Sequence, residues 1–434
     1  MIARPEPGRG PAPDVPLRYL LASAAAFVLA APGVVWLAPE LAGHYYHPRV
    51  VALTHTVTLG WITLAIMGAS YQLIPIVLGR QVWSQRLARW QFWVLLLATS
   101  GMLAHFYIGT WLGLVMAAGL LAIGVALHLV NVALSLRGVE RWGFTGRLGV
   151  LAYAGLALTV VFGLLLGFDH IIKFVSTDFF PTLHAHVHLA LLGWVMPMVL
   201  AVAARVYPMF LLAPDPRGWP EPLQFWGLAA GVPAVVLGLL LGHPAAVIAG
   251  ALAVAAAAGG HLAWVVAMAR HRRRPRLDRG LRLALAGAAF IAPGALFGLG
   301  FALDLISGPR LALAYIVVVL GGWITLTIAG LMLKIVPFLV WYRVYGSRAG
   351  KERVPMLADM SWAPAEGAAG ALLPAGFIAL AVAVASGNTE AIRAAGVVLT
   401  LGALAFGCAL GVVLAHLARR VPSRAASRLA EVGR

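Results

Sequence analysis

Long apolar runs constrain this chain more than any other feature of its sequence. Hydrophobic stretches of 18 or more residues follow one another almost to the C-terminus of a 434-residue chain that is 62% hydrophobic and 11% charged. About 20 apolar residues in a helix cross the roughly 30 Å of hydrocarbon in a bilayer, whereas a water-soluble core cannot bury so much apolar surface. The sequence therefore predicts an all-α integral membrane protein.

Twelve membrane spans are predicted, and short loops join most of them. They lie near residues 17–38, 50–78, 88–109, 111–134, 147–173, 184–212, 223–241, 244–269, 281–303, 312–342, 368–386 and 391–417. The longest connection, residues 345–367, is polar and rich in Gly and Pro, which is typical of a surface loop. We expect a single polytopic membrane domain over residues 1–434, without a soluble domain at either end.

The net charge of +17 is distributed asymmetrically along the chain. If the N-terminus is cytoplasmic, 26 of the 32 Lys and Arg residues fall in the tails and the even-numbered loops. The positive-inside rule then places both tails, residues 1–16 and 418–434, in the cytoplasm of a bacterial plasma membrane. The first span is long enough to remain as an anchor. Because the charge reports topology, we expect the lipid bilayer as partner and no nucleic acid.

A repeat divides the spans into three groups. Trp61, Trp194 and Trp323 each follow a glycine, and each is followed fourteen residues later by a proline. The separations of 133 and 129 residues each correspond to four spans. The sequence therefore predicts three pseudo-equivalent four-helix units, approximately residues 17–134, 147–269 and 281–417. Small residues and prolines alone would also suit a packing motif without chemistry.

Histidines occur at the same offset in two of the three units. His55 and His188 each lie six residues before the tryptophan of their unit. The second unit adds His184, which shares a helix face with His188, and His186, which points roughly 200° away. Histidine within a membrane is costly unless it has a partner, and neutral imidazole is a common ligand of haem iron and copper.

These four histidines are therefore predicted ligands of haem or a metal ion, the alternative being hydrogen bonds to backbone or water. His105 and His170, at span ends near the same side, are further candidates. No Asp or Glu lies in the middle of a span, which argues against a proton pump with an acid relay. The single cysteine, Cys408, excludes an internal disulfide and a multi-cysteine cluster.

The pattern resembles subunit I of the haem–copper oxidases and nitric oxide reductases, which has twelve helices in three groups of four. In that family a histidine at the outer end of helix 2 ligates the low-spin haem, and His55 matches it. Residues 186–210, beginning His-Val-His, are similar to the family's His-x-His helix. The resemblance implies haem b held by His55 and by His188 or His186.

The same resemblance implies roles for other residues near the outer side. His184, with help from His105 or His170, would serve a second haem or a copper ion. Arg49 and Arg310 would contact the haem propionates, although lipid headgroups are an alternative partner for both arginines.

Two departures from the family pattern stand out. The family carries His-x-His on helix 10, where this chain has Tyr315 and Val317, and the motif lies instead on helix 6. The helix 7–8 region, which supplies copper ligands in the family, offers only His243. The standard oxygen-reducing centre is therefore not expected. A second resemblance is to the NnrS family of haem- and copper-containing membrane proteins.

Three functions remain open at this point. The first is redox chemistry on a small gas (NO or O2), or electron transfer from quinol or a c-type cytochrome, which would make the protein an oxidoreductase. The second is non-catalytic handling, sensing or transport of haem, copper or NO, as in the NnrS type. The third is a transporter or a structural subunit that uses the repeat fold without a cofactor. No catalytic residue is predicted.

Overall fold

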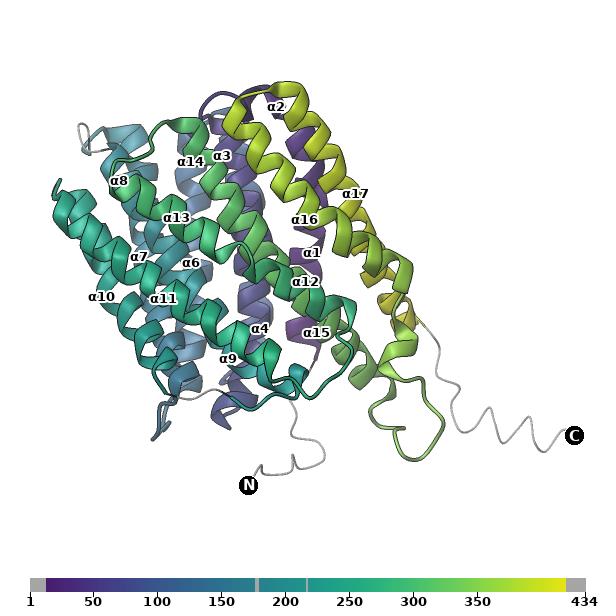
Figure 1. The fold of residues 1–434 in the computed structure, drawn as a ribbon. Coiled ribbons are helices and arrows are strands. Elements are labelled where there is room, and N and C mark those ends of the chain that lie inside the picture. The colour runs from purple at the N-terminus through teal and green to yellow at the C-terminus, as the bar shows by residue number, and fades with distance from the viewer. Residues whose placement is uncertain (1–12, 176–178, 216–217, 419–434) are drawn as a thin grey trace, which may run out of the picture.

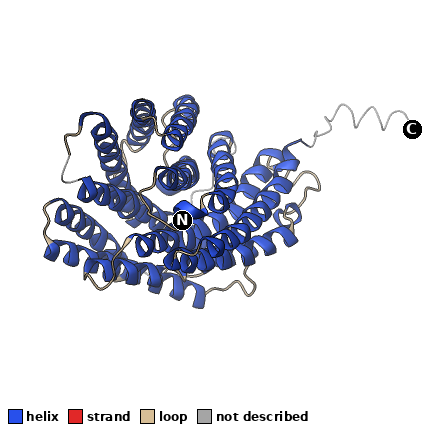
Figure 2. Cartoon of the chain, turned by 90° about the horizontal axis from the view of Figure 1, so that it is seen from above, coloured by secondary structure: helices blue, strands red, loops and turns tan. Residues whose placement is uncertain are grey.

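The computed structural model describes residues 13–175, 179–215 and 218–418 as a bundle of long helices (Figure 1). Within these ranges there is no β-strand beyond one isolated bridge pair, and the end-on view in Figure 2 shows helices joined by loops. Twelve helical segments are long and apolar enough to cross a membrane. These findings confirm the predicted all-α architecture with twelve spans.

Each span carries apolar side chains along its length and polar or turn-forming residues at its ends. In chain order the spans are α1 (Asp14–Trp36); α3 (Pro48–His55), η1 (Thr56–Thr63) and α4 (Leu64–Leu78); α5 (Gln85–Ile108); α6 (Trp111–Ser135); α7 (Phe144–Ile172); α8 (Phe179–His188), η3 (Leu189–Val195) and α9 (Met196–Leu211); α10 (Pro220–Leu240); α11 (Pro244–Arg270); α12 (Arg279–Ala288) and α13 (Ile291–Ala302); α14 (Pro309–Ile316), η4 (Val317–Thr325) and α15 (Leu326–Tyr345); α16 (Ala363–Ser386); and α17 (Thr389–Leu414) with η6 (Ala415–Ala418). Two short helices, α2 (Ala38–Leu41) and η5 (Leu357–Met360), lie in loops.

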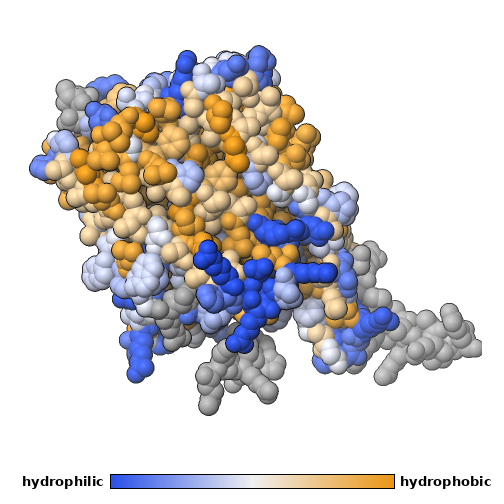
Figure 3. Space-filling view, viewed as in Figure 1, coloured by the Kyte–Doolittle hydropathy of each residue, from blue (hydrophilic) through white to orange (hydrophobic). Residues whose placement is uncertain are grey.

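The second, sixth and tenth spans form the centre of the bundle. In these three, 56%, 72% and 83% of the most apolar window is buried inside the protein, against 22% to 44% in the other nine. The outer spans turn large apolar side chains outward instead, and Figure 3 shows them as a broad hydrophobic surface. The helices that carry the Gly-Trp repeat are thus the ones around which the others pack.

Each central span contains a π-helical segment at the same place in the repeat. η1 begins at Thr56, directly after His55, and η3 begins at Leu189, directly after His188. η4 begins at Val317, which occupies the position of these histidines in the third unit. Single π-helical turns within α-helices occur frequently at functional sites, because they widen the helix and redirect its side chains. The three segments therefore mark one level of the bundle as a candidate site.

A contact between two glycines brings α7 against the sixth span. A Cβ atom built on Gly155 would lie 2.1 Å from the carbonyl oxygen of Gly193, so no larger residue fits without moving a helix. Small residues commonly allow such close approach between membrane helices. This contact fixes the position of α7 next to the His-rich start of the sixth span.

The ninth span departs from the prediction of one continuous helix over 281–303. It consists of α12 and α13, which are separated at Ala289 and Phe290. Pro293 lies just after the break and has no N–H with which to continue the α-helical hydrogen bonds. The ring of Phe290 packs over Gly322 of the central tenth span, where a Cβ atom would lie 2.1 Å from the ring.

The two ends of the bundle differ in composition. We call one the histidine end; its loops comprise residues 42–47, 109–110, 241–243, 303–308 and 387–388. We call the other the arginine end; its loops comprise residues 79–84, 136–143, 271–278 and 346–362. Helix α1 begins, and α17 ends, towards the arginine end (Figure 1). Of the predicted tails, all but residues 13–16 and 418 lie outside the described residues.

Candidate functional site

A cavity of about 760 Å³ lies among the central helices, and its lining runs from the loops of the histidine end past the repeat histidines to Trp194 and Trp323. Ligand-binding pockets in proteins typically measure about 300–1,000 Å³. One group of lining residues comes from the helices of the first and second units, α3 to α8, and a second group comes from α10, α11, α13 and α14. Most of the lining is apolar, so the few polar side chains in it stand out.

His55 lies in the lining at the junction of α3 and η1. Its Nδ1 is 2.8 Å from the carbonyl oxygen of Val51, one helical turn earlier. Because a carbonyl can only accept a hydrogen bond, Nδ1 carries the proton and Nε2 keeps its lone pair. The ring also stacks on Phe106 of α5, with centroids 5.0 Å apart. The imidazole is therefore held in one orientation and one tautomer.

His186 and His188 are held in the same way. His188 Nδ1 is 2.7 Å from the carbonyl oxygen of His184, and His186 Nδ1 is 3.0 Å from the carbonyl oxygen of Thr159 on α7. Both residues line the cavity, and neither Nε2 has a hydrogen-bond partner among the described residues. A histidine that donates from Nδ1 to a carbonyl presents Nε2 to a metal, which is the usual arrangement of histidine ligands.

His55 and His186 both line the cavity, and they come from different units. His188, two residues further along α8 than His186, points to a different side of its helix. The second span thus contributes one imidazole held through Nδ1 to the cavity lining, and the sixth span contributes two.

His184 and His170 also line the cavity, but two tyrosines engage their Nε2 atoms. Tyr45 Oη lies 3.0 Å from His184 Nε2. Tyr46 Oη lies 3.4 Å from His170 Nε2, and it donates because His170 Nδ1 already donates to a backbone carbonyl. Residues 42–47, which we call the tyrosine strap, thus extend over the histidine end of the cavity.

The strap is also packed through its rings. The Tyr46 ring lies against Phe179 and Phe180, with centroids 5.2 and 5.9 Å apart. Burial, and then the nearby Asp169 carboxylate, raise the pKa of Tyr46 to about 12, and burial also raises the pKa of Tyr45. Both phenols therefore keep their protons at neutral pH and can donate to the histidines.

The structure places three of the predicted site residues outside the cavity lining. The His105 ring packs over Gly113 of α6 and bonds to Thr110 Oγ1 at 2.6 Å. Arg49 forms an ion pair of 3.0 Å with Glu40 and lies over the Tyr107 ring. The polar atoms of His105 and Arg49 are therefore bonded to neighbours at the bundle surface.

Arg310 is the third of these residues. Its Nε donates to the carbonyl oxygen of Ala42 at 3.2 Å, and its guanidinium packs over Gly387. The side chain is exposed and ties α14 to the first residue of the tyrosine strap. Its contacts in the structure are therefore those of a loop anchor.

The histidines do not gather into a polydentate metal site. Among the described residues, no group of three or more His, Cys, Asp and Glu side chains is arranged to hold a metal ion. Copper sites in proteins usually bring together three or more such ligands, whereas haem iron needs one or two axial ligands from the protein. The donor set thus fits haem and does not fit a preformed copper site.

The tyrosine strap and Thr159 were missed by sequence reasoning. Nothing in the sequence indicates that a backbone carbonyl of α7 receives the His186 ring, because that contact depends on the Gly155–Gly193 approach. The strap carried a signal, since His44-Tyr45-Tyr46-His47 is an unusually aromatic loop. Its pairing with two other histidines could not be deduced from the loop alone.

The fold has been seen before. A haem–copper terminal oxidase dimer solved by cryo-electron microscopy superimposes with a TM-score of 0.67, at 13% sequence identity, over 94% of this chain and 85% of that one. The chain has the fold of a haem–copper terminal oxidase. Family models of protein sequences give no match, and neither do curated proteins. The similarity therefore lies in the architecture, which agrees with the fold that the histidine and tryptophan pattern predicts.

Proposed function

We propose that this protein is a haem b-binding membrane redox protein in which His55 and His186 are the axial ligands. The observation that supports this most strongly is the shared tautomer of the cavity histidines. Each donates from Nδ1 to a backbone carbonyl and leaves Nε2 free towards an apolar cavity of about 760 Å³. Imidazole held in this way is the usual axial ligand of haem b.

Haem iron in this position would supply one-electron transfer and, with an open coordination site, binding of NO or O2. The protein's own contributions follow from its contacts. Val51 and Thr159 hold the two rings in the ligating tautomer, while Phe106 fixes the ring plane of His55. The apolar lining excludes water and so favours the less charged state of a bound cofactor.

His188 extends the proposal to gas chemistry. It lines the same cavity with a free Nε2 and lies beside the second group of lining helices, which offers apolar space and the Tyr315 side chain. A second haem in that space, or a site that binds a gas, would suit chemistry on NO or O2. Without it, the protein would pass electrons from quinol or a c-type cytochrome through a single six-coordinate haem.

The proposal places the protein in a bacterial plasma membrane, with the arginine end in the cytoplasm and the cavity near the outer face. Two other functions remain testable alternatives. They are non-catalytic handling of haem, copper or NO of the NnrS type, and transport without a cofactor. The metal and haem content of the purified protein distinguishes all three.

The experiment is to purify the protein from cells supplied with haem precursor and to measure haem by the pyridine haemochrome assay and copper by mass spectrometry. We expect at least one haem b per chain, at least tenfold less in His186→Ala, and an unchanged content in His261→Ala. His261 is a matched control because it is buried and bonds to Gln224 outside the cavity lining. Copper without haem would favour the NnrS type, and neither would favour a transporter.

Carbon monoxide then separates the two redox functions. A reduced haem that binds CO has an open coordination site and indicates gas chemistry. A reduced haem that does not bind CO is held by two protein ligands and indicates electron transfer. If His188→Ala abolished the CO signal while the rest of the spectrum stayed unchanged, that result would assign the gas position to this histidine.

A further inference from the structure

The loop between α11 and α12, at the arginine end, is more strongly cationic than the other described loops. Seven arginines lie between residues 270 and 282, and Asp278 is the only carboxylate among them. Figure 3 shows hydrophilic side chains gathered below the apolar surface, over the lower ends of these helices. The other loops of this end carry at most a few basic residues each, which already suffices for a topology signal.

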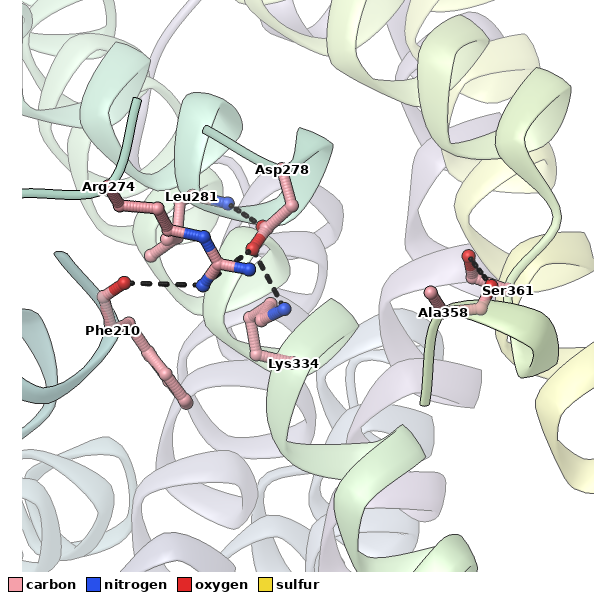
Figure 4. A network of polar contacts seen from close by, with 7 residues as sticks. All are labelled: Phe210, Arg274, Asp278, Leu281, Lys334, Ala358 and Ser361. Atoms are coloured by element: carbon pink, nitrogen blue, oxygen red, sulfur yellow. Dashed lines mark hydrogen bonds and ion pairs between the residues drawn. The ribbon is translucent and has the colours of Figure 1, made fainter. Parts of the chain in front are cut away.

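The loop is fixed in place by contacts with both neighbouring units. The Asp278 carboxylate accepts from Leu281 N at 3.0 Å, and so caps α12, and it pairs with Lys334 of α15 at 2.8 Å (Figure 4). Arg274 Nη1 lies 3.7 Å from the same carboxylate and donates to the carbonyl oxygen of Phe210 at 3.3 Å. These bonds tie the loop to α9 on one side and to α15 on the other.

Asp278 is therefore paired with Lys334 and Arg274, and most of the surrounding arginines have no counter-ion. Among the residues that the structure describes, five of the seven arginines have exposed side chains and no ion pair. They are Arg270, Arg272, Arg273, Arg276 and Arg282. Three of these guanidinium groups lie on the short, anchored loop and two lie on the helix ends beside it, and together they form a concentrated positive surface.

The position of this surface identifies its ligand. Only eight residues separate Arg270 at the end of α11 from Arg279 at the start of α12, so the guanidiniums stay at the level where the helices leave the membrane. Trp219 and Trp226 of the adjacent α10 region have exposed rings, which is typical of residues at the membrane–water interface. The groups available at that depth are phospholipid headgroups.

We propose that residues 270–282 form a binding site for an anionic phospholipid at the seam between the second and third units. Guanidinium groups bind phosphate through paired hydrogen bonds, and basic clusters beside membrane helices attract anionic lipid. A lipid held by Arg272, Arg273 and Arg276 would lie against a loop that is already tied to both units. Its binding would strengthen their association. This proposal is independent of the haem proposal.

The test uses the full-length protein in detergent, freed of native lipid, with dioleoylphosphatidylglycerol as the anionic probe and dioleoylphosphatidylcholine as the zwitterionic reference. We expect phosphatidylglycerol, and not phosphatidylcholine, to raise the melting temperature in a saturable way. In the variant Arg272→Gln/Arg273→Gln/Arg276→Gln, the half-saturating lipid concentration should rise at least tenfold. Arg86→Gln/Arg137→Gln/Arg141→Gln, which removes three exposed arginines from other parts of the same end, should change it less than twofold.

Two further measurements separate lipid binding from phosphate binding and from a general loss of stability. Inorganic phosphate at the same concentration should leave the melting temperature unchanged; an equal rise would overturn the lipid assignment in favour of free phosphate. Native mass spectrometry counts retained phosphatidylglycerol directly, even if a variant is less stable. The proposal fails if the 272/273/276 variant retains as much anionic lipid as the wild type, or if the 86/137/141 variant loses as much.

Discussion

The indole Nε1 of Trp61 donates a hydrogen bond to Thr325 Oγ1, 3.1 Å away, and so links the second span to the tenth. Trp194 donates in the same manner to Thr63 Oγ1 at 3.3 Å, which links the sixth span to the second. In both cases the acceptor is the residue two places after the tryptophan of another unit. The corresponding residue of the second unit, two places after Trp194, is Met196, which has no hydroxyl to accept such a bond. Two tryptophans of the repeat therefore link the three central spans, with the second span bonded to both the tenth and the sixth.

Replacing the acceptor should destabilise the bundle. Thr325→Val keeps the side-chain shape but leaves the buried Trp61 N–H without a partner, which costs about 1–3 kcal/mol. We expect a lower midpoint of thermal unfolding in detergent. Thr400→Val is the matched control, because the Thr400 hydroxyl bonds only to the Gly396 carbonyl of its own helix. An equal fall in the unfolding midpoint of both variants would show that the bond between units contributes no more to stability than a bond within one helix.

The contact of Gly155 with Gly193 should be intolerant of a methyl group. Gly155→Ala would place Cβ 2.1 Å from the Gly193 carbonyl oxygen, so α7 must move, at a cost of about 1–3 kcal/mol or more. Because α7 carries the carbonyl that orients His186, bound haem should fall as well. Gly149→Ala lies on the same helix with open space around it and should leave both stability and haem content unchanged.

The tyrosine strap should control access to the cavity. Removing both hydroxyls in Tyr45→Phe/Tyr46→Phe breaks the bonds to His184 and His170 and frees the loop. If the reduced protein has a haem with an open coordination site, we expect CO to bind that haem several times faster after flash photolysis, with little change in the haem spectrum. Tyr107→Phe, a change to another exposed tyrosine near this end, serves as the control. A CO rate unaffected by the double substitution would mean that ligands reach the cavity by another route.

The positive-inside rule predicts which end faces the cytoplasm. In a Cys408→Ser background, Lys351→Cys at the arginine end should be shielded from a membrane-impermeant maleimide in intact cells. Leu305→Cys at the histidine end should be labelled. Labelling of position 351 but not 305 would reverse the orientation and would place the cavity near the cytoplasm.

Much of the fold was predictable because hydrophobicity alone determines where a chain can cross a bilayer. The approximate positions of all twelve spans follow from that pattern. The π-helical segments after His55 and His188 could not be predicted, since a single widened turn barely changes the periodicity of an apolar helix. The break at Phe290 was missed because an apolar run continues through it.

The candidate site was predictable only in part. His55, His184, His186, His188 and His170 do line one cavity, as their shared depth suggested. Depth along a span does not determine which way a ring points, so His105 was counted as a candidate although it packs over Gly113. Likewise the charge of Arg49 is visible in the sequence, but its pairing with Glu40 depends on the path of a loop.

The most direct test of the central claim is the optical spectrum of the purified, dithionite-reduced protein compared with its His55→Ala variant. We predict a Soret band and a sharp α band of six-coordinate haem b in the wild type. In His55→Ala the sharp α band should be lost, while the variant remains folded by circular dichroism. A colourless wild-type protein, or a spectrum that the His55 substitution leaves unchanged, would contradict the assignment of this cavity as a haem site.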